Sequence, residues 1–318
     1  MVCAQSDPVQ RDVLVVGAGP AGLAAGIHLA RARIPHAVFG LRLGGLLLSA
    51  GLVECYPGFP GGLLAADLAA RMVGQARGLG VCIEQAGVDG LSWTRAGYRL
   101  QVQGASWQAP AVILATGTLP RPLADVELAA GVDARRVVHE TADLPLDLSG
   151  ARTIVSGGGD AAFDSALQCV ARGAQVVLIM RGDRPRALAL LVERARQAGV
   201  GLRAGCQLRR LGPHGAGLAV GLEGPGGEPS ELVADWLLAC HGREPAMCLW
   251  HGLASSHARG PRQVESHYPG LFMAGDLVRG ECRYAAVAAG DGLRCAKLAE
   301  AHLERYRARP SDPSPGST

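Results

Sequence analysis

The sequence predicts an α/β fold, because one pattern of strand, glycine-rich turn and helix occurs twice in it. In the first copy, residues 12–16 (Asp-Val-Leu-Val-Val) suit a buried strand, residues 17–22 form a glycine-rich turn, and the apolar and small residues among 23–32 fit a helix. The second copy follows 140 residues later, with its turn at 157 instead of 17. Its strand, turn and helix are expected at residues 153–156, 157–162 and 163–171.

Each copy continues with a second apolar strand, at residues 36–39 and 175–179, which completes a βαβ unit of a parallel sheet. Alternating segments at residues 98–103 and 217–222 predict smaller antiparallel strands in each half. We therefore expect two Rossmann-like domains. Residues 310–318 are rich in Pro, Ser and Gly and predict a disordered tail.

Composition excludes several classes of function. The 318 residues suffice for about two domains. With 31 basic and 28 acidic residues, the net charge of +3 is too small to indicate a nucleic-acid partner. No apolar stretch reaches the roughly 18 residues of a membrane span, and residues 1–11 lack the apolar core of a signal peptide. We expect a cytoplasmic protein that has no membrane partner.

The cysteines and histidines do not form a metal-binding or disulfide pattern. Nine cysteines occur without any C-x-x-C pair, so neither a zinc ribbon nor a disulfide scaffold is predicted. His251 and His257 are six residues apart in a stretch rich in Ser and Gly, which favours a loop over a ligand pair. No metal site is expected.

Both glycine turns have the form that binds a dinucleotide. In G-x-G-x-x-G, the first Gly makes the turn, the second lets the backbone approach a pyrophosphate, and the third lets helix and strand pack closely. The first turn has Gly17, Gly19 and Gly22 at these places, and the second ends in alanine, with Gly157, Gly159 and Ala162. The N-terminus of each following helix then faces the anion.

The residues after the second turn favour NADP. Its second strand ends at Met180, where a site for NAD usually carries an acid that binds the ribose 2′-hydroxyl. Arg181, Arg184 and Arg186 follow instead, and guanidinium groups suit a 2′-phosphate. The alternative is that these arginines are solvated on a turn and that NAD is the donor.

Further motifs carry a family resemblance. They are Gly44-Gly45-Leu46, residues 53–60 (Val-Glu-Cys-Tyr-Pro-Gly-Phe-Pro), Ala115-Thr116-Gly117, residues 242–245 (Gly-Arg-Glu-Pro), residues 273–276 (Met-Ala-Gly-Asp) and Arg283-Tyr284-Ala285. Together with the first glycine turn, their order and spacing resemble the low-molecular-weight thioredoxin reductase family over about residues 11–305.

The resemblance implies FAD in a discontinuous domain, residues 10–118 plus 246–309, with a nicotinamide domain, residues 119–245, inserted into it. It also implies a homodimer. The implied FAD residues are Gly17, Gly19, Pro20, Ala21, Gly22, Gly44, Gly45, Leu46, Tyr56, Ala115, Thr116, Gly117, Gly275, Asp276, Arg283, Tyr284 and Ala285. The implied NADP residues are Gly157, Gly159, Asp160, Ala161, Ala162, Arg181, Arg184, Arg186 and Gly242. For Asp276, which suits the ribityl hydroxyls, the alternative is a helix N-cap.

The chain departs from the family at its redox disulfide. Counting back from the second glycine turn places the family's two cysteines on Glu140 and Asp143. Carboxylates cannot relay electrons by thiol–disulfide exchange, so the thioredoxin reductase reaction is expected to be absent. Glu140, Asp143 and His139 are candidates to donate or accept a proton beside the flavin, and a solvated connection between domains is the alternative. Cys282 is a weaker catalytic candidate.

These observations predict an FAD-dependent NAD(P)H oxidoreductase that passes electrons to an unidentified acceptor, either a small molecule or a small redox protein such as ferredoxin. Two alternatives remain open. The first is a thioredoxin-reductase-like ferredoxin or flavodoxin–NADP reductase, a branch that also lacks the disulfide. The second is a flavin-binding redox sensor or partner subunit with little turnover.

Overall fold

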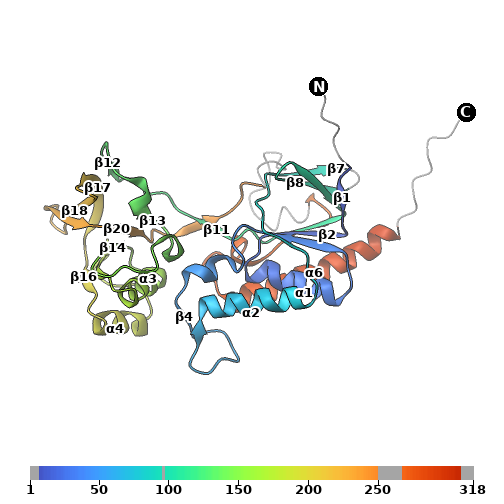
Figure 1. The fold of residues 1–318 in the computed structure, drawn as a ribbon, viewed down its shortest axis with the longest axis horizontal. Coiled ribbons are helices and arrows are strands. Elements are labelled where there is room, and N and C mark those ends of the chain that lie inside the picture. The colour runs from blue at the N-terminus through green and yellow to red at the C-terminus, as the bar shows by residue number, and fades with distance from the viewer. Residues whose placement is uncertain (1–6, 95–96, 250–266, 309–318) are drawn as a thin grey trace, which may run out of the picture.

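The computed structural model describes residues 7–94, 97–249 and 267–308, which form two lobes side by side (Figure 1). The first lobe is built on a five-stranded parallel sheet in the order β22-β10-β2-β3-β6. The strands are β2 (Val13–Val16), β3 (His36–Phe39), β6 (Ile83–Glu84), β10 (Ala111–Leu114) and β22 (Leu271–Met273). The predicted βαβ unit is therefore present.

The two faces of this sheet have different covers. One face carries three helices, α1 (Pro20–Arg31), α2 (Ala65–Gly78) and α6 (Ala285–Arg307). The other faces a four-stranded sheet in the order β1-β9-β8-β7. Its strands are β1 (Val9–Gln10), β7 (Gly90–Thr94), β8 (Gly97–Val102) and β9 (Ala105–Ala109). The strand expected at residues 98–103 is β8 and pairs antiparallel with β7 and β9, as predicted.

The second lobe repeats this plan. Its parallel sheet has the order β13-β20-β14-β15-β16, packs α3 (Asp160–Ala171) and α4 (Ala189–Gln197) on one face, and carries the sheet β12-β17-β18-β19 on the other. The strands of the parallel sheet are β13 (Val137–Val138), β14 (Arg152–Ser156), β15 (Gln175–Ile179), β16 (Gly201–Arg203) and β20 (Trp236–Ala239). Those of the second sheet are β12 (Glu127–Leu128), β17 (Gln207–His214), β18 (Gly217–Glu223) and β19 (Pro229–Ala234).

Shorter elements complete the fold and connect the lobes. The chain passes between the lobes at β11 (Thr118–Pro120) and β21 (Arg243–Pro245), which pair antiparallel (Figure 1). β4 (Leu52–Val53) pairs with β5 (Leu63–Leu64). The short 3₁₀ helices are η1 (Gly45–Ser49), η2 (Ala134–Arg136), η3 (Thr141–Asp143) and η4 (Gly275–Leu277).

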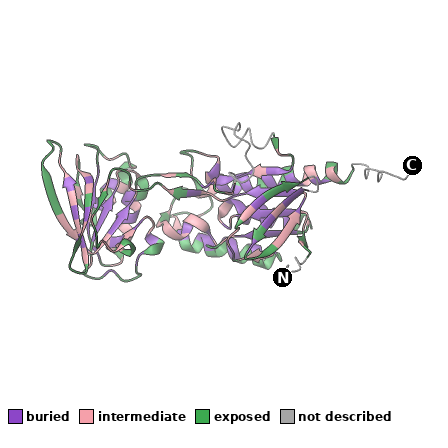
Figure 2. Cartoon of the chain, turned by 90° about the horizontal axis from the view of Figure 1, so that it is seen from above, coloured by how far each residue is buried: buried purple, intermediate pink, exposed green. Residues whose placement is uncertain are grey.

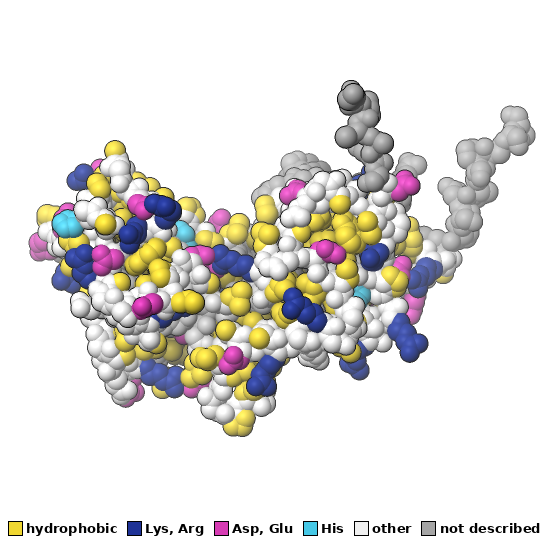
Figure 3. Space-filling view, in the orientation of Figure 1, with side chains coloured by type: hydrophobic (Ala, Val, Ile, Leu, Met, Phe, Trp, Pro, Cys, Tyr) yellow, Lys and Arg dark blue, Asp and Glu magenta, His cyan; other side chains and the backbone are white. Residues whose placement is uncertain are grey.

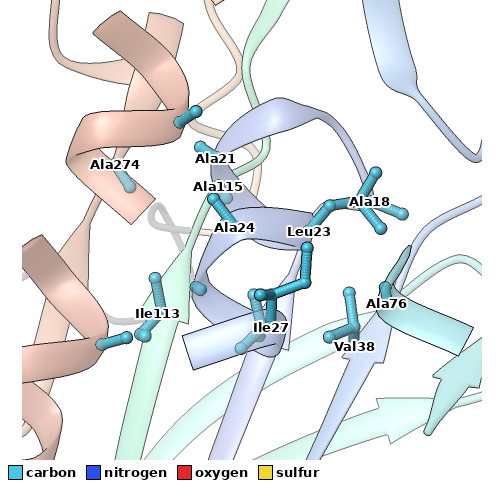
Figure 4. Packing of buried hydrophobic residues seen from close by; sticks show 14 of the residues in the cluster. Ala18, Ala21, Leu23, Ala24, Ile27, Val38, Ala76, Ile113, Ala115 and Ala274 are labelled. Carbon is cyan, nitrogen blue, oxygen red and sulfur yellow. The ribbon is translucent and has the colours of Figure 1, made fainter. Parts of the chain in front are cut away.

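Alternation along β2 places its side chains in two different cores. Val13 and Val15 belong to the cluster under the helices, whereas Leu14 and Val16 belong to the cluster against the second sheet. Small residues let the helices approach closely, and Figure 4 shows Ala21 and Ala24 of α1 among these side chains. The four clusters of buried hydrophobic residues in the described chain lie two in each lobe, and none spans both (Figure 2).

Two helix boundaries differ from the sequence prediction. α1 begins at Pro20 rather than at residue 23, and α3 at Asp160 rather than at residue 163. In both copies the last residues of the glycine turn are already helical. At the start of α1, Pro20 suits the first position of a helix because its missing N–H has no partner there. The tail predicted at 310–318 and the pair His251 and His257 lie outside the described residues. Within the described residues, no helix is long and apolar enough to cross a membrane.

Candidate functional site

The first glycine turn connects β2 to α1, and two of its three glycines are required by packing. A Cβ on Gly17, which has φ +118°, would lie 2.5 Å from the carbonyl carbon of Ala115 and closer still to its oxygen. A Cβ on Gly22 would lie 2.9 Å from the carbonyl carbon of Gly17. Gly19 is different, since its Cβ would meet only Gly45 Cα, at 3.8 Å. Gly19 therefore borders open space at the start of α1.

The other implied FAD residues collect at the same edge of the sheet. β2, β10 and β22 are parallel, so the segments that follow them emerge side by side. Gly44 N donates to Ala18 O at 2.8 Å, which brings η1 to the turn, and Thr116 Oγ1 donates to Ala246 O at 2.9 Å. The N-terminus of α1 has no side-chain cap. This edge can receive a pyrophosphate on free backbone donors.

Asp276 lies in η4, where a carboxylate can reach a ligand. It is half-buried, and within the described residues it makes no hydrogen bond or ion pair. Burial raises the pKa of its carboxyl, and the nearby Arg283 and Arg243 act in the opposite direction. The N-cap alternative is wrong, because Tyr284 is the N-cap of α6 and Ala274 is that of η4.

Asp291 is an acidic residue that the sequence interpretation missed. Its carboxylate is 3% exposed, accepts from Gly275 N at 3.3 Å and pairs with Arg279. The carboxylate of Asp291, a residue of α6, therefore holds η4 in place. Gly275, at φ +70°, packs closely on α1, because its Cβ would lie 3.0 Å from Ala21 Cβ.

The last implied FAD residues lie just before α6 and in the 53–60 loop. Arg283 is half-buried, and its Nη2 donates to Arg243 O at 3.4 Å. Tyr284 is exposed, and Ala285 opens α6. Tyr56 packs on the helical core of the first lobe, 5.9 Å from the ring of Phe59.

The second glycine turn repeats the geometry of the first. A Cβ on Gly157, which has φ +151°, would lie 2.6 Å from Cys240 O, whereas a Cβ on Gly159 would meet nothing within 4 Å. Ala162 is buried under the turn. Residues 181–188 fold over it, because Arg186 N donates to Gly158 O at 2.7 Å and Leu188 N donates to Asp160 Oδ1 at 2.8 Å.

The three arginines of this loop are exposed. Within the described residues, Arg181, Arg184 and Arg186 form no ion pair. Their backbone is fixed beside the glycine turn while their side chains are available to an anion. The three arginines thus lie exposed on the loop after β15, beside the second glycine turn.

Two histidines lie next to this turn, and the sequence interpretation named one of them, His139, but not the other, His241. His241 Nε2 lies 2.7 Å from Ser156 Oγ, and His139 Nδ1 lies 3.2 Å from Ala239 O. Partial desolvation lowers the pKa of His241, and His139 and Arg181 lower it further. His241 directly precedes Gly242, which was its only sequence signal.

Glu140 and Asp143 are held by arginines from other parts of the chain. Arg42 Nη1 donates to Glu140 Oε2 at 2.6 Å, and Arg42 Nη2 donates to Asp143 Oδ1, also at 2.6 Å. Arg243 Nη2 reaches Glu140 Oε1 at 3.0 Å, and Ser49 Oγ donates to Oε2 at 3.1 Å. The sequence interpretation gave no role to Arg42 or Ser49.

No disulfide joins any of the cysteines in the described residues. Cys55 and Cys282 are exposed, and Cys169 is buried. Burial raises the pKa of the Cys169 and Cys240 thiols to about 11 each, so both are poor nucleophiles. No group of three or more His, Cys, Asp or Glu in the described parts of the chain could hold a metal ion.

The known proteins that resemble this chain agree with the predicted family. The chain is 29% identical over 92% of its length to NADPH-dependent thioredoxin reductase 3 of Arabidopsis thaliana, but spans only 58% of that protein. It is 30% identical over 92% of its length to the thioredoxin reductase of Mycolicibacterium smegmatis and spans 96% of it.

A crystal structure of thioredoxin reductase from Lactococcus lactis matches the fold with a TM-score of 0.80 at 23% identity, covering 93% of this chain and 99% of that one. Residues 11–292 match the model of the pyridine nucleotide-disulphide oxidoreductase family. The chain therefore belongs to the pyridine nucleotide-disulphide oxidoreductase family and is a thioredoxin-reductase-like member of it.

Proposed function

We propose that this chain is an FAD-dependent NAD(P)H oxidoreductase that reduces its acceptor without a dithiol of its own. The observation that carries the binding of two dinucleotides is the contrast within each glycine turn, and the lack of a dithiol is proposed from Glu140 and Asp143. Gly17 and Gly157 are required by the packing of the protein itself, whereas Gly19 and Gly159 border open space at a helix N-terminus. The packing of the described residues does not require glycine at those two positions, whereas the close approach of a pyrophosphate would.

We assign FAD to the first turn. The uncapped start of α1 suits the pyrophosphate, and the half-buried Asp276 suits the ribityl hydroxyls. Residues of η1 and of the segments after β10 and β22 would line the rest of the site. When bound, FAD takes two electrons from a reduced nicotinamide and passes them to the acceptor.

We assign NADP to the second turn. Arg181, Arg184 and Arg186 supply cations around a loop fixed to Gly158. Arginine suits a 2′-phosphate because its planar fork can donate two hydrogen bonds to one anion. NAD remains the alternative donor.

The acceptor site is proposed to lie beside Glu140 and Asp143, with His139 nearby along the chain. We expect changes at Glu140 or Asp143 to lower acceptor turnover more than flavin reduction, because these carboxylates would donate or accept a proton for the acceptor, whereas hydride transfer between the two cofactors needs no side-chain acid or base. The measurement is the two rates for Glu140→Gln and Asp143→Asn. A larger loss in flavin reduction would contradict this placement.

The acceptor is proposed to be a small molecule or a small redox protein other than thioredoxin. The relatives named above do not support ferredoxin, so it enters only as one candidate to be tested. A homodimer also remains a proposal.

The test is anaerobic stopped-flow reduction of the purified protein by NADPH and NADH, followed by thioredoxin, small disulfides, quinones, ferredoxin and oxygen. Rapid bleaching of the flavin and turnover with an acceptor other than thioredoxin would support the proposal. Rapid reduction of thioredoxin would contradict the proposal that the chain works without a dithiol relay. A bound flavin that NADPH reduces only very slowly would favour the low-turnover sensor.

A further inference from the structure

Hydrogen bonds and ion pairs cross between the two lobes, and no cluster of buried hydrophobic residues in the described chain spans both. Their hydrophobic cores are separate, and the chain links them by the two short strands β11 and β21. Figure 3 shows the hollow between the lobes on one side, with basic and acidic side chains interspersed. In a protein built this way, the contacts between the lobes determine their relative orientation.

Those contacts form a seam between residues 42–54 of the first lobe and η3, α3 and α4 of the second. Arg194 of α4 holds Glu54 with two bonds, of 2.6 and 3.0 Å. Thr141 Oγ1 donates to Ser49 O at 2.7 Å. Gly51 N donates to Asp164 Oδ2 at 2.9 Å, and this bond crosses from one lobe to the other.

Glu140 is the centre of the seam. Its side chain is only 12% exposed, and its two oxygens bind Arg42 and Ser49 of the first lobe and Arg243 of the connecting strand β21. Arg243 also donates from Nε to Thr118 Oγ1 at 2.8 Å, which secures the paired strand β11. One carboxylate thus joins the second lobe to the first lobe and to the connection.

We propose that Glu140 and Arg42 form an ionic latch that fixes the orientation of the two lobes, with Glu140 acting as a positioning residue. The latch does not depend on which acceptor or cofactor the protein uses. Arg42 is 48% exposed on its side chain, so dissolved ions reach the pair and weaken it. An apolar interface would not weaken in this way.

The Gly51 amide reports the state of the seam directly. Its hydrogen bond goes to the other lobe, so the amide exchanges with solvent only when the seam opens. Arg42 contacts neither Gly51 nor Asp164 in any hydrogen bond or ion pair of the described residues. A change at Arg42 therefore tests coupling along the seam.

The experiment is residue-resolved hydrogen exchange at Gly51 in the protein as purified, in low salt and in about 0.5 M salt. We expect Arg42→Ala to speed exchange about tenfold or more and to remove most of the salt dependence. Glu140→Gln, which keeps the shape and loses the charge, should act in the same direction. The matched control is Arg209→Ala, which removes an ion pair of 2.9 Å to Glu223 within the second lobe.

Gly51 exchange that is equal in Arg42→Ala and in the control would overturn the latch. So would a rate in the unaltered protein that does not change with salt. If Arg42→Ala does not fold, Glu140→Gln decides by the same two readings. Neither reading involves turnover, so the latch and the proposed function can fail separately.

Discussion

Replacing Gly19 by valine tests whether this glycine is needed by a bound ligand, in contrast to Gly17, which is needed by the fold itself. Gly19 is the N-cap of α1 at φ −81° and ψ −173°, an extended conformation that valine adopts readily. Its Cβ would meet only Gly45 Cα, at 3.8 Å, an ordinary contact. Gly17→Ala is the matched comparison, because it alters the same turn two residues away.

The expected magnitudes differ widely. Gly19→Val should change the stability of the FAD-free protein by no more than about 1 kcal/mol, the usual range for a changed N-cap. Gly17→Ala forces an overlap with the Ala115 carbonyl at a positive φ, and should cost on the order of 3 kcal/mol. FAD at 100 times its dissociation constant adds about 2.7 kcal/mol to a protein that binds it.

The assay is thermal unfolding with and without added FAD, together with flavin absorbance after gel filtration. The unaltered protein should gain about 4 °C from FAD. Gly19→Val should unfold near the FAD-free protein, gain nothing from FAD and emerge colourless. Stoichiometric flavin on Gly19→Val, or a loss of stability as large as that of Gly17→Ala, would refute the reasoning.

Three other predictions concern the nucleotide and the thiols. Arg181→Glu should lower the ratio of flavin reduction rates with NADPH and NADH about tenfold or more by repelling a 2′-phosphate, and an unchanged ratio would place that phosphate elsewhere. Changing Cys55 and Cys282 together to Ser should leave flavin reduction and acceptor turnover intact, and a loss of turnover would reveal a thiol relay. Cys169 and Cys240 should resist a thiol reagent at pH 8 and react only as the pH approaches about 11, because burial disfavours the reactive thiolate. The labelled positions are identified by mass spectrometry, and fast labelling of either cysteine at pH 8 would contradict this prediction.

Local sequence patterns predicted the fold well, because each βαβ unit is formed by one continuous segment of the chain. The strands and the helices around both glycine turns were found, and the largest differences are the starts of α1 and α3, each predicted three residues too late, since small turn residues do not look helical by apolar periodicity. The contacts of Glu140 could not be predicted. Its partner Arg42 lies 98 residues away, and only the placement of the lobes brings the two together.

The arginines and the carboxylates at this site satisfy each other's charges and hydrogen-bonding groups. A half-buried guanidinium such as that of Arg243 needs acceptors, and Glu140 supplies one from a side chain that is only 12% exposed. A neutral thiol at position 140 would leave Arg243 with the Thr118 oxygens and Arg42 with Asp143 alone. Introducing cysteines at 140 and 143 would therefore remove the charges that hold the seam as well as add thiols. We propose that this chain has a contact between its lobes at the place where its relatives have an electron relay, and we therefore expect its acceptor among compounds that react at the flavin itself.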